Sequence, residues 1–468
     1  MSERPNLLFV FSDQHRACDL GCYGNDKVLS PNLDALAKGG ALFRNFYSNS
    51  PLCVPARGTL LTGLHAMRHR AAGNDLPINE QCESLGAALQ REGYLTGYIG
   101  KWHLGGVPRD QFIDKDRRLG FEEWYVANCN HNYNEGYYYD QDNQHHVIEG
   151  YEPIVQTDLA VNFIERNREK PWAAVLSWGP PHEPYLTAPK HQQDYYEEVE
   201  MSLRPNVPDR ITTYGDQFLS RDEIPDLMRG YYAHITALDE QMGRLIDALK
   251  ETDQLENTII VYTSDHGDMV GSQGYMNKQL PYEESVNVPL IISWPGNIQP
   301  GERKGLASLV DLPVTLTHMV GASFKEKPDG RDFSAMLTDT EAPGAEYCYL
   351  YELTACHQSA DRDTPAWRGL RTERYTFATL FDGTPWILYD NQEDPYQMNN
   401  LVTDPKHKSL VKELKKSLDC EVHLHDSYVS PEILIKDAGL LSEWNRSQAY
   451  FNRPLFADDS VQECHSNH

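Results

Sequence analysis

Short apolar runs alternate with amphipathic segments through most of the chain, and this alternation restricts the fold more than any other feature. The apolar runs have the length of buried strands, whereas the segments between them repeat apolar residues at three- and four-residue steps, as helices do. Predicted strands cover residues 7–11, 94–99, 172–177, 258–263 and 288–293, and predicted helices cover residues 32–38, 84–91, 159–166 and 226–249. Such a pattern is typical of βα units. We therefore expect the α/β class, with a central mixed, mostly parallel sheet flanked by helices.

The pattern changes near residue 340. Beyond it, strand-like runs follow one another with only turns between them, which indicates an antiparallel sheet. These runs cover residues 347–353, 367–371, 375–380 and 386–389. A chain of 468 residues also exceeds the size that one hydrophobic core usually serves. We expect two domains: residues 1–340, and a smaller α+β domain, residues 341–468, that completes a substrate pocket.

Acidic residues dominate the charge of the chain: 42 Lys and Arg face 69 Asp and Glu, which gives a net charge of −27. Such a chain lacks the basic surface by which proteins bind nucleic acid. It also has no apolar stretch of about 20 residues that would span a bilayer. We therefore expect neither nucleic acid nor membrane as a partner.

The N-terminal sequence indicates the cellular compartment that we expect for the protein. Met1 is soon followed by the strand-like residues 7–11, without the apolar region and small-residue cleavage site of a secretory signal. The sequence as it stands predicts a cytoplasmic protein, and a periplasmic or secreted one would require that a signal had been removed. The nine cysteines are scattered without paired spacing, so we expect neither a disulfide framework nor a zinc site.

Two of the predicted strands end in similar polar residues. Residues 7–11 lead into Ser12-Asp13-Gln14, and residues 258–263 lead into Ser264-Asp265-His266. In open α/β sheets ligands bind at the carboxyl ends of the strands, so both pairs would face one crevice. Two carboxylates there would repel each other unless a cation lay between them, and Asp13 with Asp265 would balance one divalent ion. The alternative is that each aspartate caps the helix after its strand.

A third polar feature is the segment Cys53-Val54-Pro55-Ala56-Arg57. Pro55 suits the first turn of a helix, which would place Cys53 at a helix N-terminus, where an anionic atom is favoured. Arg57, one turn further, would bring a fixed positive charge to the same place. An isolated cysteine near a helix start is commonly inert. The motif C-x-P-x-R followed by Thr59-Leu60-Leu61-Thr62-Gly63 is far more specific.

With these motifs the sequence resembles the formylglycine-dependent (type I) sulfatases of the alkaline-phosphatase-like superfamily. Cys53 to Arg57 matches the family motif C-x-P-S/A-R. Further matches, in the family's order, are Asp13-Gln14, Gly100-Lys101-Trp102-His103-Leu104-Gly105, Pro180-Pro181-His182, Asp265-His266-Gly267, Lys278 and Leu388-Tyr389-Asp390. The matches run from residue 6 to about residue 401. The resemblance implies that residues 1–340 form an alkaline-phosphatase-like catalytic domain.

The resemblance implies a modified residue and a bound metal ion. Cys53 would be oxidised to formylglycine (3-oxoalanine) by a formylglycine-generating or anaerobic sulfatase-maturating enzyme. One divalent metal would be held by Asp13, Gln14, Cys53, Asp265 and His266. Calcium is the expected ion because it prefers oxygen. Magnesium or manganese stays open because many sulfatases have Asp-Asp and Asp-Asn where this chain has Asp13-Gln14 and Asp265-His266.

The resemblance also implies roles for the catalytic residues Cys53, Arg57, Lys101, His103, His182 and Lys278. Arg57, Lys101 and Lys278 would, with the metal, offset the charge of an anionic ester in this acidic protein. His182 and Lys278 would lie on the side of the leaving group, where a proton is needed. Lys101 and His103 would lie on the side of the nucleophile, with His103 accepting a proton so that sulfate leaves and the aldehyde forms again.

The implied reaction is hydrolysis of a sulfate monoester, and a sulfated carbohydrate is the expected substrate. Rival interpretations are a phosphonate monoester hydrolase or phosphodiesterase with the same nucleophile, a choline sulfatase and an arylsulfatase. A binding protein whose Cys53 stays unoxidised is a further alternative. Candidate substrate-binding residues are Asn74, Asp75, Tyr137, His357 and Arg371. Tyr137 belongs to a tyrosine-rich segment, residues 131–139. The rings of this segment would either stack on sugar rings or belong to a structural loop. The sequence leaves a homo-oligomer open.

Overall fold

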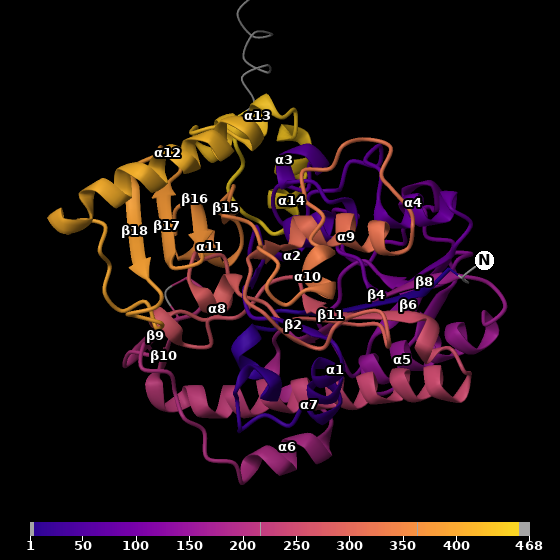
Figure 1. Ribbon diagram of the computed structural model, residues 1–468. Coiled ribbons are helices and arrows are strands. Elements are labelled where there is room, and N and C mark those ends of the chain that lie inside the picture. Colours follow the sequence, from indigo (N-terminus) through magenta and orange to yellow (C-terminus); the bar gives the residue numbers. More distant parts are fainter. Residues whose placement is uncertain (1–3, 216, 363, 458–468) are drawn as a thin grey trace, which may run out of the picture.

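The computed structural model describes residues 4–215, 217–362 and 364–457. Its centre is a ten-stranded sheet (Figure 1). In spatial order the strands are β13 (Gly301–Arg303), β2 (Ala41–Phe43), β12 (Leu290–Ser293), β11 (Thr258–Ser264), β1 (Asn6–Asp13), β8 (Trp172–Pro181), β4 (Leu95–Lys101), β5 (Glu123–Ala127), β6 (Tyr137–Tyr139) and β7 (His145–Val147). The central strands from β11 to β5 are parallel, whereas β12, β6 and β7 pair antiparallel. The predicted mixed, mostly parallel α/β sheet is confirmed.

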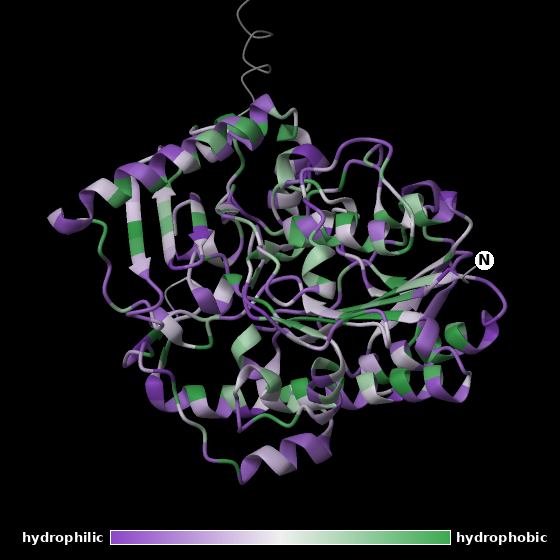
Figure 2. Ribbon diagram, in the orientation of Figure 1, coloured by the Kyte–Doolittle hydropathy of each residue, from purple (hydrophilic) through white to green (hydrophobic). Residues whose placement is uncertain are grey.

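The strand residues alternate between two hydrophobic cores, one on each face of this sheet. In β1, Leu7, Phe9 and Phe11 belong to one core, whereas Leu8 and Val10 belong to the other. Because both faces are covered, the central strands read in the sequence as continuous apolar runs. Figure 2 shows these strands in green at the middle of the molecule.

Helices cover both faces of the sheet (Figure 1). One side carries α1 (Pro31–Gly39), α5 (Glu152–Arg166), α6 (Lys190–Glu197) and α7 (Ile224–Glu251), and the other carries α2 (Cys53–Thr62), α4 (Leu85–Arg91), α9 (Leu312–Met319) and α10 (Ala335–Thr338). The long α7 buries Ile235, Leu238 and Met242 in one core, as their helical spacing predicts. Within the described ranges, no helix combines the length and the apolar character needed to cross a membrane.

A separate antiparallel sheet follows in the chain, as predicted. It consists of β15 (Tyr347–Glu352), β16 (Trp367–Thr372), β17 (Tyr375–Leu380) and β18 (Pro385–Asp390), and it is followed by α12 (Lys408–His425), α13 (Pro431–Asp437) and α14 (Leu441–Tyr450). Its core also contains Leu52, Ala66, Ala72 and Leu76 from the first part of the chain. The division at residue 340 stays a prediction, and residues 458–468 of the predicted second domain lie outside the described residues.

Shorter elements connect the main ones. They are β3 (Phe46–Tyr47) paired with β14 (Ala307–Ser308), β9 (Arg210–Thr212) paired with β10 (Phe218–Ser220), and the helices α3 (Ala66–His69), α8 (Glu283–Val286) and α11 (Gln358–Asp361). The register of β1 against β11 pairs Ser12 with Ser264. Asp13 and Asp265 therefore leave the sheet side by side, as expected from the two similar strand ends.

Candidate active site

Arg57 lies between the two strand-end aspartates. Its Nη2 donates to Asp13 Oδ2 and its Nε donates to Asp265 Oδ2, each over 3.0 Å, and all three side chains are fully buried. Nη1 donates to the Lys101 carbonyl and to the Ser177 hydroxyl, each over 2.8 Å. Each nitrogen of the guanidinium is thus bonded within the protein. Arg57 therefore orients the two carboxylates and does not line the cavity described below.

Cys53 begins α2, so the prediction that it lies at a helix N-terminus is confirmed. Its Sγ lies 3.2 Å from His266 Nε2 and 3.7 Å from Asp13 Oδ1, and the residue is 1% exposed. The residue before the helix offers no side-chain cap. Instead, Asn74 Oδ1 accepts the Val54 N–H over 3.1 Å, which satisfies one of the free N–H groups of the first helical turn.

The surroundings of Cys53 favour a negative charge. Burial opposes ionisation of its thiol, but Lys278, Lys101 and His266 hold the pKa of this thiol well below its usual value. Lys101 Nζ also donates to Asp13 Oδ2 over 2.6 Å. This place therefore carries a local positive potential, although the chain as a whole has a net charge of −27.

Asp13, Cys53, Asp265 and His266 form a cluster that could hold a metal ion. Each offers one ligand atom, these atoms lie within 4.8 Å of one another, and all four residues are buried. His266 Nδ1 donates to the Gly267 carbonyl over 2.9 Å, so Nε2 keeps its lone pair for the cluster. Burial and the charge of Asp13 raise the pKa of Asp265, and a cation would relieve this repulsion. Two carboxylates and an imidazole nitrogen fit one divalent cation.

Gln14, a predicted metal ligand, lies beside this cluster with both ends of its amide already bonded. Its Oε1 accepts a hydrogen bond from Lys278 Nζ, and its Nε2 donates to Asp268 Oδ2 over 2.7 Å. Its backbone N–H donates to Asp265 Oδ1 over 3.1 Å. Gln14 therefore connects the cluster to Lys278. The buried carboxylate of Asp268, which closes the segment Asp265-His266-Gly267-Asp268 after β11, was not among the predicted site residues.

Asp75 forms hydrogen bonds with side chains from distant parts of the chain. Its Oδ1 lies 3.3 Å from His103 Nε2 and accepts from Arg109 Nε over 2.8 Å. Its Oδ2 accepts from Arg109 Nη2 over 2.8 Å and lies 2.9 Å from His357 Nε2. Burial opposes the charge of His103, yet Cys129 and Asp75 raise the pKa of this histidine to about 10. Asp75 itself has a fully buried side chain, so it positions its partners and does not face the cavity.

Cys53 lines a cavity of about 660 Å³. The other predicted site residues that line it are Asn74, His103, His182, Lys278 and His357. Seven more predicted residues are buried and do not line it: Asp13, Gln14, Arg57, Asp75, Lys101, Asp265 and His266. The structure thus brings nearly all the predicted residues to one cavity and its buried surroundings.

Besides Asp75, two predicted substrate-binding residues, Tyr137 and Arg371, do not line this cavity. Tyr137 lies in β6, and its ring stacks on that of His145 in β7, with centroids 5.2 Å apart. Arg371 Nε donates to Glu283 Oε1 over 2.7 Å, and its guanidinium lies over the Tyr47 ring. Both side chains are held by neighbours elsewhere in the fold, which a pattern of residues along the chain cannot foresee.

Further residues line the cavity that were not predicted from the sequence, including Arg109, Tyr185 and Met276. They lie on loops or short helical turns that carry no motif. His131, which belongs to the tyrosine-rich segment of Tyr137, also lines the cavity. Its ring lies 4.3 Å from that of His182.

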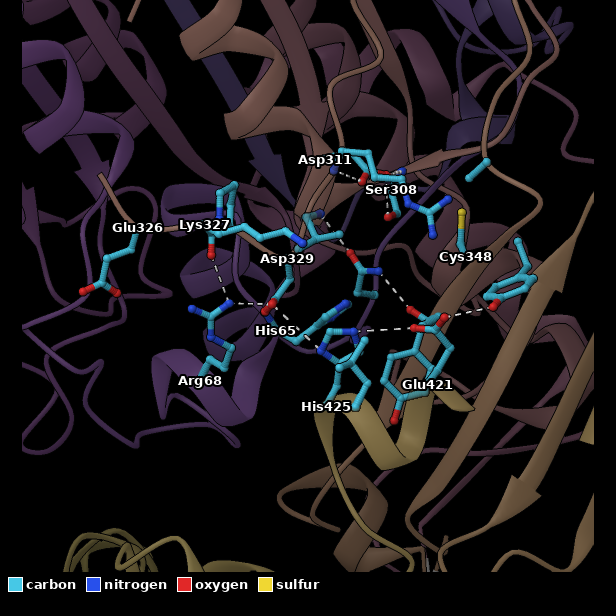
Figure 3. A pocket seen from close by; sticks show the side chains of 18 residues that line it. His65, Arg68, Ser308, Asp311, Glu326, Lys327, Asp329, Cys348, Glu421 and His425 are labelled. Carbon is cyan, nitrogen blue, oxygen red and sulfur yellow. Dashed lines mark hydrogen bonds and ion pairs between the residues drawn. The ribbon is translucent and has the colours of Figure 1, made fainter. Parts of the chain in front are cut away.

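A second cavity, of about 650 Å³, lies where the second sheet meets the first part of the chain (Figure 3). Asp329 pairs with Arg68 over 2.6 Å, and His425 lies 4.0 Å from Asp329 and 3.5 Å from Glu421. Figure 3 shows these four side chains in a row, with the charges turned toward one another. None of the predicted catalytic or metal-binding residues lines this cavity. We therefore take the cavity at Cys53 as the candidate active site.

The chain is similar to known proteins along most of its length. Residues 5–322 match the Sulfatase family, and residues 271–423 match the family described as N-sulphoglucosamine sulphohydrolase, C-terminal. An ulvan-active sulfatase of Formosa agariphila is 35% identical, over 92% of this chain and 84% of that protein. An N-acetylglucosamine-6-O-sulfatase of Bacteroides thetaiotaomicron is 29% identical, over 89% of this chain and 86% of that protein.

A solved structure shares the fold and some of the sequence. It is described as a complex with the substrate D-glucosamine-2-N,6-O-disulfate. It aligns with a TM-score of 0.80 at 25% identity, over 90% of this chain and 98% of that one. The Sulfatase match covers more than half of the chain, and it includes the strand-end aspartates, Cys53 and Lys278. The chain therefore belongs to the sulfatase family and is a sulfuric ester hydrolase.

Proposed function

We propose that this enzyme hydrolyses sulfate monoesters of carbohydrates, with formylglycine made from Cys53 as the nucleophile, and releases inorganic sulfate and an alcohol. The observation that carries the proposal is the place of Cys53. It lies at a helix N-terminus in a positive local potential, with His266 Nε2 at 3.2 Å and Asp13 Oδ1 at 3.7 Å. An oxygen nucleophile at this position would be favoured as an anion beside a cation.

The proposed cofactors follow from the donor set. Hydrated formylglycine supplies a hydroxyl nucleophile, and a divalent cation held by Asp13, Asp265, His266 and residue 53 supplies positive charge beside the ester. Replacing the thiol by oxygen makes the set richer in oxygen, which favours calcium over softer metals. Cys53 and Arg57 are buried in the folded chain, so a maturating enzyme would act before folding is complete.

The chain's own residues orient the reactants and hold protons. Arg57 fixes the two aspartates, and Lys101 Nζ, 2.6 Å from Asp13 Oδ2, adds a charge beside them. On one side of residue 53, Asp75 holds the Nε2 edge of His103, and the neutral form of this imidazole would accept a proton as sulfate departs. On the other side, Lys278 and His182 hold a proton for the oxygen of the leaving alcohol.

A carbohydrate is the proposed substrate class because of the relatives and the cavity. The relatives named above act on ulvan and on N-acetylglucosamine-6-O-sulfate by their descriptions, and the solved neighbour binds a glucosamine disulfate. A cavity of about 660 Å³ has room for a sugar unit beside the sulfate. Its lining combines polar groups such as Asn74 and His357 with apolar side chains such as Leu186 and Leu227, which suits the polar edges and apolar faces of a sugar ring.

Parallel turnover assays test the proposal. Wild-type enzyme and Cys53→Ala are compared on a panel of sulfated sugars, an aryl sulfate and a phosphonate monoester, and intact mass is measured on the same samples. We expect sulfated sugars to be turned over by the wild type alone, with a loss of ~18 Da at Cys53 from its oxidation. Cys420→Ala, which changes an exposed cysteine, should behave as wild type. A phosphonate rate above every sulfate rate, or full activity of Cys53→Ala, would overturn the proposal.

A further inference from the structure

Arg109 is a permanent cation of the cavity with an unused hydrogen-bonding edge. The described lining residues include one lysine, Lys278, and one arginine, Arg109. Lys278 is bonded to Gln14 and His182. Arg109 uses Nε and Nη2 in a two-pronged pair with Asp75, whereas its Nη1 makes no hydrogen bond to any residue in the described ranges. The side chain is 23% exposed, although its partner carboxylate is fully buried.

The guanidinium of Arg109 is held in place from two directions. Asp75 fixes one edge, and the Phe451 ring covers one face, with its centroid 4.7 Å from Arg109 Cζ. Phe451 also packs edge-on against His357, at 5.0 Å between centroids. Arg453 anchors this last segment after α14, because it donates to the His357 carbonyl over 3.3 Å. An arginine that is already ordered loses little conformational entropy when it binds a ligand.

The remaining lining directs an anion toward Arg109. Leu186, Leu219, Leu227 and Met276 line the same cavity and cannot solvate a charge. Among the described residues that line the cavity, one is acidic: Glu183, which accepts a hydrogen bond from Tyr214. The Asp75 carboxylate contacts His103 and His357 as well as Arg109. Its negative charge is therefore not used only to neutralise the positive charge of Arg109.

We infer that Arg109 is a specificity-determining residue that binds a second anionic group, a carboxylate or a further sulfate, on the sugar whose sulfate ester lies at Cys53. The inference rests on the proposed function and narrows its substrate class to sugars with two negative charges. Hydrogen bonds from a guanidinium to an anion are about twice as strong as those to a neutral hydroxyl. In a chain with a net charge of −27, such a substrate needs a fixed cation for each of its charges.

Binding to the Cys53→Ala variant tests the inference without any turnover. Calorimetry compares pairs of monosulfated disaccharides in which the second sugar carries either a carboxylate or the alcohol made by reducing it. A third member of each set carries a second sulfate in place of the carboxylate. We expect at least one doubly anionic member to bind about 10- to 100-fold more tightly than its neutral counterpart. Adding Arg109→Gln should remove this preference, while Arg109→Lys should keep part of it.

Controls separate binding from structure. Arg117→Gln changes a partly exposed arginine that pairs with Glu80 and does not line the cavity, and it should leave the preference intact. Phe451→Ala leaves Arg109 in place but removes its support, so it should lower the preference and serves as the second variant if Arg109→Gln does not fold. The inference is overturned if Arg109→Gln weakens the binding of all the sugars equally. It is also overturned if the Cys53→Ala protein binds doubly anionic sugars no more tightly than their neutral counterparts. Failure of the proposed function is recognised separately, by the turnover and mass measurements described above.

Discussion

Lys278 Nζ lies 2.7 Å from His182 Nε2, and the Nδ1 of the same imidazole donates to the Glu183 carbonyl over 2.8 Å. Because Nδ1 carries a hydrogen, Nε2 is the acceptor for the ammonium group of Lys278. A proton is therefore shared between two side chains that both line the cavity with Cys53. In the proposed mechanism this pair protonates the alcohol as it leaves.

Removal of this pair should affect substrates according to their leaving groups. We expect Lys278→Met and His182→Gln to lower kcat/KM for a sugar sulfate by roughly 10²- to 10⁴-fold. An aryl sulfate should lose much less, because a phenolate leaves without a proton. Steady-state rates across a series of leaving groups measure this. Lys250→Met, at an exposed lysine paired with Asp247, should change neither rate. Equal losses for sugar and aryl sulfates would argue against a proton-holding role.

Arg57 should be a major contributor to stability as well as to the site. Arg57→Leu would leave Asp13 and Asp265 buried without their shared partner, which we expect to lower the free energy of unfolding by about 3–5 kcal/mol. Urea denaturation followed by circular dichroism measures this. Arg44→Gln breaks a partly exposed pair with Glu302 and should cost less than about 1 kcal/mol. Similar small losses for both variants would contradict the structural role of Arg57.

Metal removal should lower both activity and stability, because Asp13 and Asp265 would lose the cation that offsets their repulsion. We expect chelator-treated enzyme to be inactive and to unfold at a lower Tm, and added calcium to restore both properties. At a free calcium concentration of 100 times Kd, binding should contribute about 2.7 kcal/mol. Asp265→Asn should bind less metal by elemental analysis. Unchanged activity and Tm in protein shown to be metal-free would refute the cluster, and restoration by magnesium alone would refute calcium.

Buried histidines should make stability fall in mild acid. Ala71 N–H donates to His69 Nδ1 over 3.2 Å, so this ring is held neutral, and burial lowers its pKa to about 3. Below a pH of about 6.5 the unfolded chain binds a proton that the folded chain excludes. The stabilising contribution of His69 is thus complete above that pH and decreases on acidification, by about 1.4 kcal/mol per pH unit.

Urea denaturation between pH 7 and pH 4.5 checks this dependence on His69. The His69→Gln variant should have a smaller pH slope of the unfolding free energy than the wild type, whatever its stability at pH 7. His423→Gln, at an exposed position of α12, should keep the wild-type slope. Identical slopes for all three proteins would rule out this role of His69.

Much of the fold could be predicted because its signals are local. The apolar run of residues 7–11 has the composition of a strand buried on both faces, and α7 repeats Ile235, Leu238 and Met242 at helical steps. The Cys53–Arg57 motif likewise carries its helix start and its charge within five neighbouring positions. Parallel pairing of β1 with β11 then brings Asp13 beside Asp265, since the ends of neighbouring parallel strands share one edge of the sheet.

The sequence by itself therefore determined the class of fold and the family, and it named most of the residues that the structure places around Cys53. Only the tertiary structure decided which loops reach the cavity. Asp75, Arg109, His357 and Phe451 come from four distant segments, and they meet through side-chain packing that no spacing along the chain encodes. The same packing holds Tyr137 on His145 and Arg371 on Glu283, away from the cavity. Backbone periodicity depends on neighbours in the sequence, whereas the place of a loop side chain depends on the contacts it finds after the chain has folded.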